Sequence, residues 1–219
     1  MIFSQRVAVT ETKYIVLTAE SDLRQTPPSQ KEERMSESKL VALSCNGDSE
    51  SFRLLYQSYQ TRVRSTLYQL CGRTMLDDLV QEVFLRTWKG LPKLKKAEYF
   101  STWIYRICWN VATDYRRKLA KNARKIDSTT DLESVVWEST AYDPQATNLM
   151  QLHYQDLVRR GLEHLRLSHR VVIVLHDLED IPQREIAQIL KIPIGTVKSR
   201  LYHARNTLKK FLQQQGLSF

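Results

Sequence analysis

The stretch between Ile181 and Lys210 carries the side chains whose types and spacing are best suited to recognition chemistry. Within it, an apolar stripe at helical spacing is formed by Val197, Leu201, Ala204 and Leu208. If that stripe is buried, the opposite face of the helix presents Lys198, Ser199, Tyr202, His203 and Arg205. These cationic and hydrogen-bonding groups suit base edges and phosphates.

Two short helices are needed to position these groups. Residues Gln183 to Leu190 repeat apolar residues at helical spacing, and Lys191 to Pro193 break the pattern because proline removes a backbone donor. A second helix then begins near Gly195 or Thr196, so the segment is predicted to be a helix-turn-helix. An ordinary helical hairpin with a solvated charged face is the alternative. The seven cations and one acid of residues 183–210 favour DNA binding.

The charge distribution points to nucleic acid at two separate places. The 219-residue chain has a formal net charge of +9. Residues 86–125 hold twelve Lys or Arg and two acids, whereas residues 126–182 hold ten acids and four arginines. Two basic blocks therefore flank an acidic interval, which is the electrostatic footprint expected of a protein with two nucleic-acid contacts.

Other function classes lack support in the sequence. Cys45, Cys71 and Cys108 are far apart, which argues against a zinc site or a disulfide framework and favours buried thiols. No apolar run has the length of a membrane span and no secretory signal opens the chain, so we expect a cytoplasmic protein without membrane insertion. No glycine-rich phosphate loop, metal cluster or activated nucleophile is present, so no catalytic residue, cofactor or enzymatic activity is expected.

The composition predicts an all-α protein of two small helical domains joined by a flexible linker. Residues 1–34 are predicted to be a disordered extension, and Met35 is a possible start of the chain. Residues 36–118 form the first domain, 119–142 an acidic linker, and 143–213 the second domain. The predicted helices are Ser36–Cys45, a long helix through Phe52 and Leu70 with its N-cap at Asp48 or Ser49, Leu76–Lys89, Phe100–Lys118, one starting at Asp143-Pro144, and His169–Glu179 capped by Ser168.

The helix from Phe100 to Lys118 combines aromatic and polar faces beside a basic loop. The loop, Gly90 to Glu98, reads GLPKLKKAE, and the helix has a polar strip that includes Arg106, Asn110 and Arg117. Single-stranded nucleic acid is bound by rings that stack on bases and by cations that hold phosphates. Most of the apolar aromatics are nevertheless expected in the core, Trp103 included.

Three segments in this order resemble the bacterial RNA polymerase sigma factors of the extracytoplasmic-function (ECF) subgroup of the sigma-70 family. They are DLVQEVFLRTW, FSTWIYRICWNVATDYRRK and IPQREIAQILKIPIGTVKSRLYHARNTL, and the resemblance extends over about residues 36–212. It implies a factor that binds core RNA polymerase, directs it to promoters and promotes promoter melting. The first domain would be sigma region 2 and the second sigma region 4.

The resemblance also implies roles for individual residues. Core polymerase, through the clamp helices of its largest subunit, would be bound by Asp78, Gln81 and Glu82, which without the resemblance would be read as a solvated face. The −10 element would be bound by Trp103, Arg106, Asn110, Asp114 and Arg117, and the loop Leu91 to Tyr99 would accept an unstacked base. The −35 element would be bound by Thr196, Lys198, Ser199, Arg200, Tyr202, His203 and Arg205. The second domain would sit on the flap of the second large subunit.

Two departures from the family pattern and one rival reading remain. The segment HLRLSHR stands where the family usually has a Leu-Pro pair followed by arginine, and His203 takes a position often held by arginine. Imidazole is a weaker cation than guanidinium, which predicts a weaker or altered −35 contact. The rival is a dimeric helix-turn-helix regulator with a palindromic site. An anti-sigma factor as partner is expected from the family only.

Overall fold

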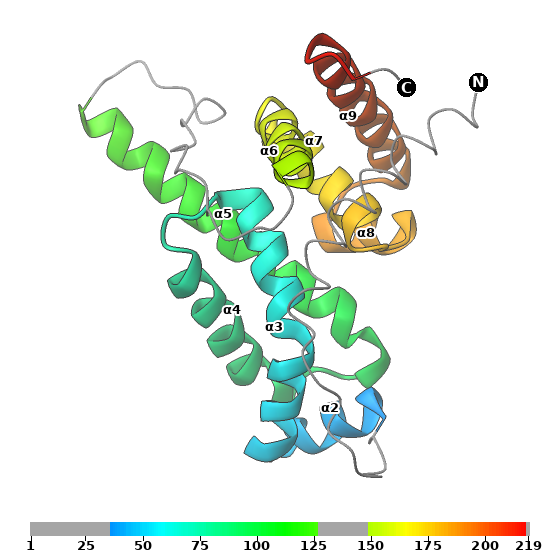
Figure 1. Cartoon of the computed structure of the whole chain (residues 1–219). Coiled ribbons are helices and arrows are strands. Elements are labelled where there is room, and N and C mark those ends of the chain that lie inside the picture. Colours follow the sequence, from blue (N-terminus) through cyan, green and yellow to red (C-terminus); the bar gives the residue numbers. More distant parts are fainter. Residues whose placement is uncertain (1–35, 127–148, 218–219) are drawn as a thin grey trace. The chain divides into compact units, whose positions relative to one another are not determined.

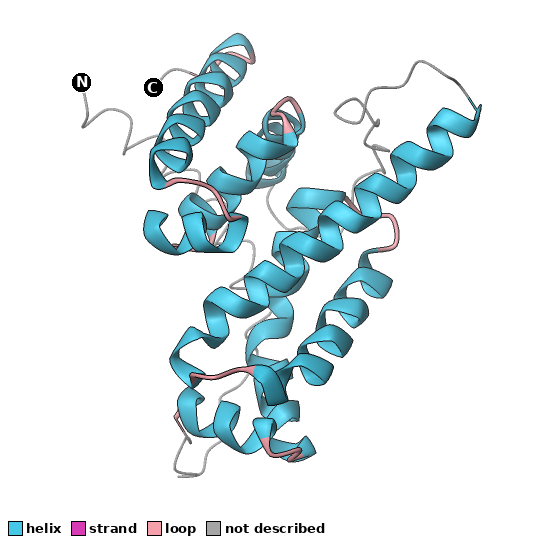
Figure 2. Ribbon diagram, turned by 180° about the vertical axis from the view of Figure 1, so that it is seen from behind, coloured by secondary structure: helices cyan, strands magenta, loops and turns pink. Residues whose placement is uncertain are grey.

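The computed structural model describes residues 36–126 and 149–217, which form helices and no strand (Figures 1 and 2). The described residues belong to two compact units. One contains residues 36–126 and 184–192, and the other contains residues 149–183 and 193–217. The all-α prediction is therefore confirmed. The predicted N-terminal extension, most of the predicted linker and the predicted helix start at Asp143-Pro144 lie outside the described residues.

The first unit is built on the long helix α3, which contacts α2, α4 and α5 (Figure 1). Its helices are α2 (Glu37–Cys45), α3 (Ser49–Cys71), α4 (Leu76–Gly90) and α5 (Phe100–Ile126), with the short 3-10 turns η1 (Leu91–Lys93) and η2 (Ala97–Tyr99) between α4 and α5. Helix α3 starts where the sequence predicts, because the Asp48 carboxylate accepts a hydrogen bond from the Ser51 amide at 3.0 Å.

Apolar side chains at helical spacing fill the centre of this unit. Leu55, Val63 and Leu67 recur along one face of α3 and are at most 1% exposed. Val83 of α4 and Ile104 of α5 are fully buried as well. Burial of these faces leaves the polar rows of α4 and α5 at the surface, where a partner can reach them.

Helix α5 is longer than the sequence pattern indicated. It continues to Ile126, past the predicted end at Lys118 and into the predicted linker. The added residues, LAKNARKI, contain no glycine or proline and are mostly good helix formers, and Ala120 is fully buried. A polar helix end needs no apolar periodicity, which is why the loss of periodicity was a poor guide to where this helix ends.

The second unit consists of α6 (Leu149–Glu163), α7 (Leu167–Ile173), the π-helical turn η3 (Val174–Leu178) and α9 (Ile194–Gln214). Helix α9 contacts both α6 and α7. The sequence prediction of one helix from His169 to Glu179 was wrong in detail. The helix begins at Leu167, with Arg166 rather than Ser168 at the N-cap position, and its last turn widens so that the Glu179 amide donates to the Val174 carbonyl at 3.1 Å.

The helix-turn-helix segment follows the predicted order. Helix α8 (Gln183–Leu190) has the predicted bounds, three residues form the turn, and α9 begins at Ile194 with Pro193 at the N-cap position. This start is one residue before the predicted Gly195. Lys191, the first residue after α8, takes a left-handed conformation with φ of 54°, which no longer continues the helix.

Two further sequence predictions can be compared with the structure. Cys108 is buried as predicted, but Cys45 and Cys71 are only partly buried. Burial raises the pKa of the Cys45 thiol, which donates to the Leu91 carbonyl at 3.2 Å. Among the described helices, none has both the length and the apolar character required to cross a bilayer.

Candidate nucleic-acid interface

Helix α9 presents the polar row that the sequence predicted. The apolar stripe through Val197, Leu201 and Ala204 is at most 2% exposed. The opposite face is exposed at Lys198, Ser199, Tyr202 and His203, and Tyr202 is 58% exposed. Thr196 and Arg200 are half-buried at the edges of this face. The row offers a cation, a hydroxyl, a phenol and an imidazole along one helix face, which suits base edges and phosphates in a major groove.

Arg205 does not belong to this exposed row, contrary to the sequence-based expectation that it faces outward. Its guanidinium donates to both oxygens of the Asp177 carboxylate, at 3.0 Å through Nε and 2.5 Å through Nη2. The Asp177 side chain is only 7% exposed, and that of Arg205 is 27% exposed. Arg205 therefore holds α9 against η3 in a bidentate ion pair.

The second basic segment lies on α5. Asn110 and Arg117 are exposed, whereas Trp103, Arg106 and Asp114 are half-buried. The Trp103 indole packs near the Phe100 ring, with 6.1 Å between centroids, and lies against the backbone of Gly90 at the end of α4. A side chain at position 90 would place its Cβ 2.7 Å from the indole, so glycine is what allows this contact.

The loop before α5 displays an aromatic ring beside a cation. Tyr99 is 51% exposed, and the Lys96 ammonium lies 5.6 Å from the centre of its ring. At the other end of the loop, Leu91 is fully buried and anchors η1. The loop is therefore anchored at Leu91 and exposes an aromatic ring and lysines near Tyr99. Single-stranded nucleic acid is bound by this combination, because bases stack on the ring and lysines hold the phosphates.

The polar face of α4 contains both exposed residues and residues that form ion pairs within the protein. Asp78 and Gln81 are exposed, but the Glu82 carboxylate accepts a hydrogen bond from Arg86 at 2.7 Å. Arg86 also donates to Asp114 of α5 at 2.9 Å. The hydrogen bond to Asp114, followed in size by the one to Glu82, raises the pKa of Arg86. This arginine links the predicted polymerase-binding helix to the predicted −10 helix.

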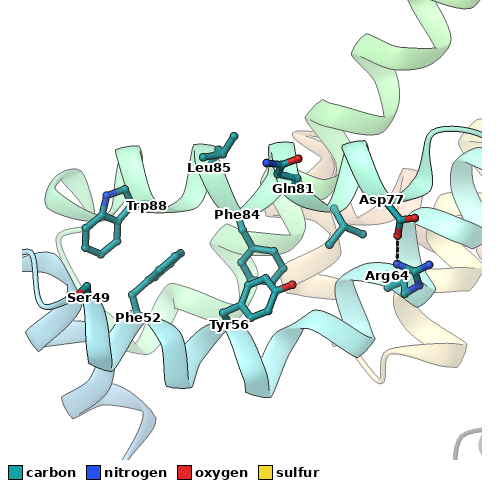
Figure 3. A pocket seen from close by; sticks show the side chains of 10 residues that line it. Ser49, Phe52, Tyr56, Arg64, Asp77, Gln81, Phe84, Leu85 and Trp88 are labelled. Carbon is teal, nitrogen blue, oxygen red and sulfur yellow. Dashed lines mark hydrogen bonds and ion pairs between the residues drawn. The ribbon is translucent and has the colours of Figure 1, made fainter.

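An open apolar groove of about 600 Å³ lies between α3 and α4, next to the exposed face of α4 (Figure 3). Aromatic pairs across the two helices form its lining: Phe52 with Trp88 at 4.8 Å between centroids, and Tyr56 with Phe84 at 4.5 Å. At one end, Arg64 of α3 pairs with Asp77 of α4, as Figure 3 shows. Gln81 is the predicted polymerase-binding residue that lines this groove.

Two residues of these surfaces were missed by sequence reasoning as members of a site: Arg86 and Asp177. Tyr99 was included only as the last residue of the loop predicted to accept an unstacked base. The exposure of Tyr99 could not be separated from core packing by spacing alone. In the sequence, Asp177 is one acid among many in the acidic interval, but in the structure it lies in the π-helical turn η3 and pairs with Arg205 of α9. Within the described parts of the chain, no group of three or more His, Cys, Asp or Glu side chains could hold a metal ion.

Comparison with known proteins agrees with this arrangement of two basic helical units. The family model "Sigma-70 region 2" matches residues 55–122, and "Sigma-70, region 4" matches residues 155–208. The ECF RNA polymerase sigma-E factor of Escherichia coli K12 is 30% identical over 186 residues, covering 83% of this chain and 96% of that protein. The sigma-E factor of Haemophilus influenzae is 29% identical over 191 residues, covering 83% of this chain and 97% of that protein.

Solved structures share the fold at lower sequence identity. The sigma factor RpoE of Bartonella quintana, in complex with the anti-sigma factor NepR, gives a TM-score of 0.61 at 22% identity and covers 75% of this chain and 98% of its own. CnrH in complex with the cytosolic domain of CnrY gives 0.59 at 22% identity and covers 81% and 97%.

A protein with sigma regions 2 and 4 in this order is a sigma factor of the sigma-70 class. The chain belongs to the ECF RNA polymerase sigma factors. It acts with core RNA polymerase in promoter recognition and transcription initiation, and the alternative of a conventional dimeric regulator is not favoured.

Proposed function

We propose that the exposed face of α9 reads the −35 element of the promoters that this sigma factor selects. The observation that carries the proposal is the exposed row Lys198, Ser199, Tyr202 and His203 on the second helix of the helix-turn-helix segment. In a helix-turn-helix, residues in the first turns of the second helix reach base edges in the major groove. Arg205 is left out of this set because Asp177 holds it internally.

The −10 element is assigned to α5 and the loop before it. Asn110 and Arg117 supply exposed polar contacts, and Tyr99 supplies a ring on which a base released from the duplex can stack. Stacking on an aromatic side chain contributes about 1–3 kcal/mol per base. Binding of the opened strand in preference to the duplex shifts the equilibrium toward melting without ATP.

Core polymerase is assigned to the exposed part of α4, at Asp78 and Gln81. Glu82 is assigned the same contact through its position, but its ion pair with Arg86 also gives it a structural part. We extend to this chain the expectation of an anti-sigma partner, since the relative from Bartonella quintana was solved with one. Residues 36–118 and 143–213 are the proposed limits of the two functional regions.

Reconstituted transcription tests the function directly. Purified core polymerase with this chain should initiate at promoters where core polymerase alone does not. Lys198→Ala should reduce initiation about tenfold at promoters with a −35 element, since it removes a charged contact to DNA. The reduction should be smaller on a template whose −35 segment is replaced. An equal reduction in initiation on both templates would show that Lys198 does not recognise the −35 element.

The polymerase contact has its own test. The double variant Asp78→Ala, Gln81→Ala should weaken core binding about tenfold, because two exposed contacts are truncated without loss of an internal ion pair. Glu50→Ala on α3, where Glu50 pairs only at the surface with Arg53, is the matched control and should leave core binding unchanged. Fluorescence titration of labelled chain with core polymerase gives both affinities. Unchanged binding by the double variant would exclude this face of α4.

A further inference from the structure

Four charged side chains form a row across α4 and α5, beside the surface proposed to bind the −10 element. Negative and positive groups alternate along this row, in the order Glu82, Arg86, Asp114 and Arg117. Arg86 donates to Glu82 through Nε at 2.7 Å and to Asp114 through Nη1 at 2.9 Å. Arg117 Nη1 lies 3.6 Å from the other oxygen of Asp114, which is too far for a hydrogen bond. Arg86 is therefore the closer partner of Asp114.

Asp114 is an acidic group on a helix face that otherwise suits DNA. It lies four residues after Asn110 and three before Arg117, so these three side chains share one face of α5. A carboxylate at this place repels phosphates and attracts nearby guanidinium groups. Among the described residues, Arg86 and Arg117 are the cations that pair with it. The charge of Asp114 is thus compensated both from α4 and from the proposed DNA-binding face of α5.

Exposure separates the parts that the two arginines can play. The Arg86 side chain is 40% exposed, and two carboxylates hold its guanidinium. A planar guanidinium has fixed donors, so two acceptors together restrain its orientation. The Arg117 side chain is 71% exposed, and an exposed ion pair of this kind is weak, so Arg117 can exchange Asp114 for a phosphate. Arg86 therefore suits a fixed internal contact, whereas Arg117 suits a contact with DNA.

We propose that Arg86 is a positioning residue for the −10 contact: it neutralises Asp114 from α4 and so leaves Arg117 available to a phosphate of the opened strand. The inference rests on the proposed role of α5 in binding the −10 element. Without Arg86, Asp114 would hold Arg117 on α5, because Arg117 is the other described cation that pairs with it. A phosphate would then meet a carboxylate and a guanidinium that is engaged elsewhere. Arg86 itself makes no contact with DNA.

The test counts phosphate contacts through the dependence of DNA affinity on salt. The full chain with saturating core polymerase is titrated with a fluorescent single-stranded oligonucleotide, the non-template −10 segment of a promoter on which the holoenzyme initiates. The titration is repeated from about 0.05 to 0.2 M KCl, and loss of one phosphate contact reduces the slope of log affinity against log salt by about 0.7. Arg86→Gln should show this smaller slope and bind about fivefold more weakly at the lowest salt.

A second substitution separates this mechanism from a purely structural one. Asp114→Asn removes the carboxylate that would hold Arg117, so the double variant Arg86→Gln, Asp114→Asn should regain the wild-type slope and at least the wild-type affinity. Arg86→Lys keeps a cation but loses the planar fork, so its slope should lie between those of wild type and Arg86→Gln. Arg64→Gln removes an arginine of α3 that pairs with Asp77 of α4, and this matched control should leave the slope unchanged.

Arg117→Ala distinguishes the positioning role from the −10 role itself. It should reduce the slope by about 0.7, and adding Arg86→Gln should reduce it no further, because the phosphate contact is absent in both. Circular dichroism and thermal unfolding identify the variants that fold. If those Arg86 variants keep the wild-type slope, or if Asp114→Asn does not restore it, the positioning role is excluded while Arg117→Ala still supports the −10 role. If Arg117→Ala leaves the slope unchanged, the phosphate contact of Arg117 fails and the positioning role fails with it.

Discussion

At the scale of single residues, the ion pair between Asp177 and Arg205 fixes how α9 is presented. Burial alone would raise the pKa of the Asp177 carboxyl group. The hydrogen bonds with His176 and Arg205 have the larger combined effect, so the pKa is lowered. A bidentate pair of this kind restrains the position of α9 about its own axis as well as its distance from η3. The side chains at 198, 199, 202 and 203 can then face outward together. We infer that Arg205 supports DNA recognition through position rather than contact.

Asp177→Asn should destabilise the second unit by about 3 kcal/mol at pH 7, because it leaves the partly buried Arg205 charge without its counter-ion. The folded-state pKa of Asp177 is depressed, so its stabilising effect is present above about pH 4 and is lost as pH falls through the lower folded value. The difference between wild type and variant should therefore shrink in acid. Thermal unfolding as a function of pH measures this.

Asp156→Asn is the matched control for that experiment. Asp156 pairs with Arg159 at 2.6 Å, but its side chain is 48% exposed, so the pair is screened by solvent. Its replacement should change stability by less than about 0.5 kcal/mol. If both variants unfold at the same temperature as wild type, the ion pair of Asp177 has no structural role.

At the scale of elements, the contact between α4 and α5 sets the position of α5, the helix proposed to bind the −10 element. Arg86 holds Asp114 across the two helices, and Gly90 lets the Trp103 indole lie against the end of α4. Trp103 is thereby both a packing residue and a candidate DNA contact. The small residue at the end of α4 therefore affects the position of Trp103 on the surface that is proposed to bind DNA.

Gly90→Ala should displace the Trp103 indole, because the new Cβ would lie 2.7 Å from the ring. A clash of this kind costs about 1–3 kcal/mol. The variant should unfold at a lower temperature and form open promoter complexes less readily. Gly195→Ala in α9 is the control, since its Cβ would meet nothing within 4 Å and alanine favours the helix. Equal stability of both variants would show that Trp103 does not rest on Gly90.

The sequence predicted elements more reliably than their ends. Apolar periodicity located α3, α4 and α8 because each buries a stripe at helical spacing. For α5, apolar periodicity predicted an end that is too early, at Lys118, because the last turns of this helix are polar. It could not foresee η3, since one extra residue in a turn changes hydrogen bonding without changing composition. Asp177, the partner of Arg205, lies within this widened turn, so the missed element and the residue wrongly expected at the surface belong to one contact.

For the candidate sites, the sequence predicted which residues of α9 are exposed but not which site residues form internal ion pairs. Exposure of Lys198, Ser199, Tyr202 and His203 could be predicted, because the position of each follows from the buried stripe of α9. The internal pairing of Glu82, Asp114 and Arg205 could not, since each ion pair joins residues whose contact depends on packing or on a side-chain conformation. Their assigned roles toward polymerase and DNA stay predictions.

At the scale of the whole molecule, two basic helical units are carried on one chain. Each unit offers one helix with an exposed polar face, α5 in the first and α9 in the second. Covalent linkage raises the effective concentration of each unit once the other is bound, so neither needs high affinity alone. Selection of a promoter then depends on both contacts, one with duplex and one with opened strand.

The most direct measurement compares two promoter templates in the presence of core polymerase and this chain. One template is fully paired, and the other has an unpaired, otherwise identical −10 segment. Holoenzyme should bind the unpaired template more tightly, and Tyr99→Ala should remove most of that preference by deleting the exposed ring. Equal affinity for the two templates, or a preference that core polymerase shows without the chain, would contradict the account.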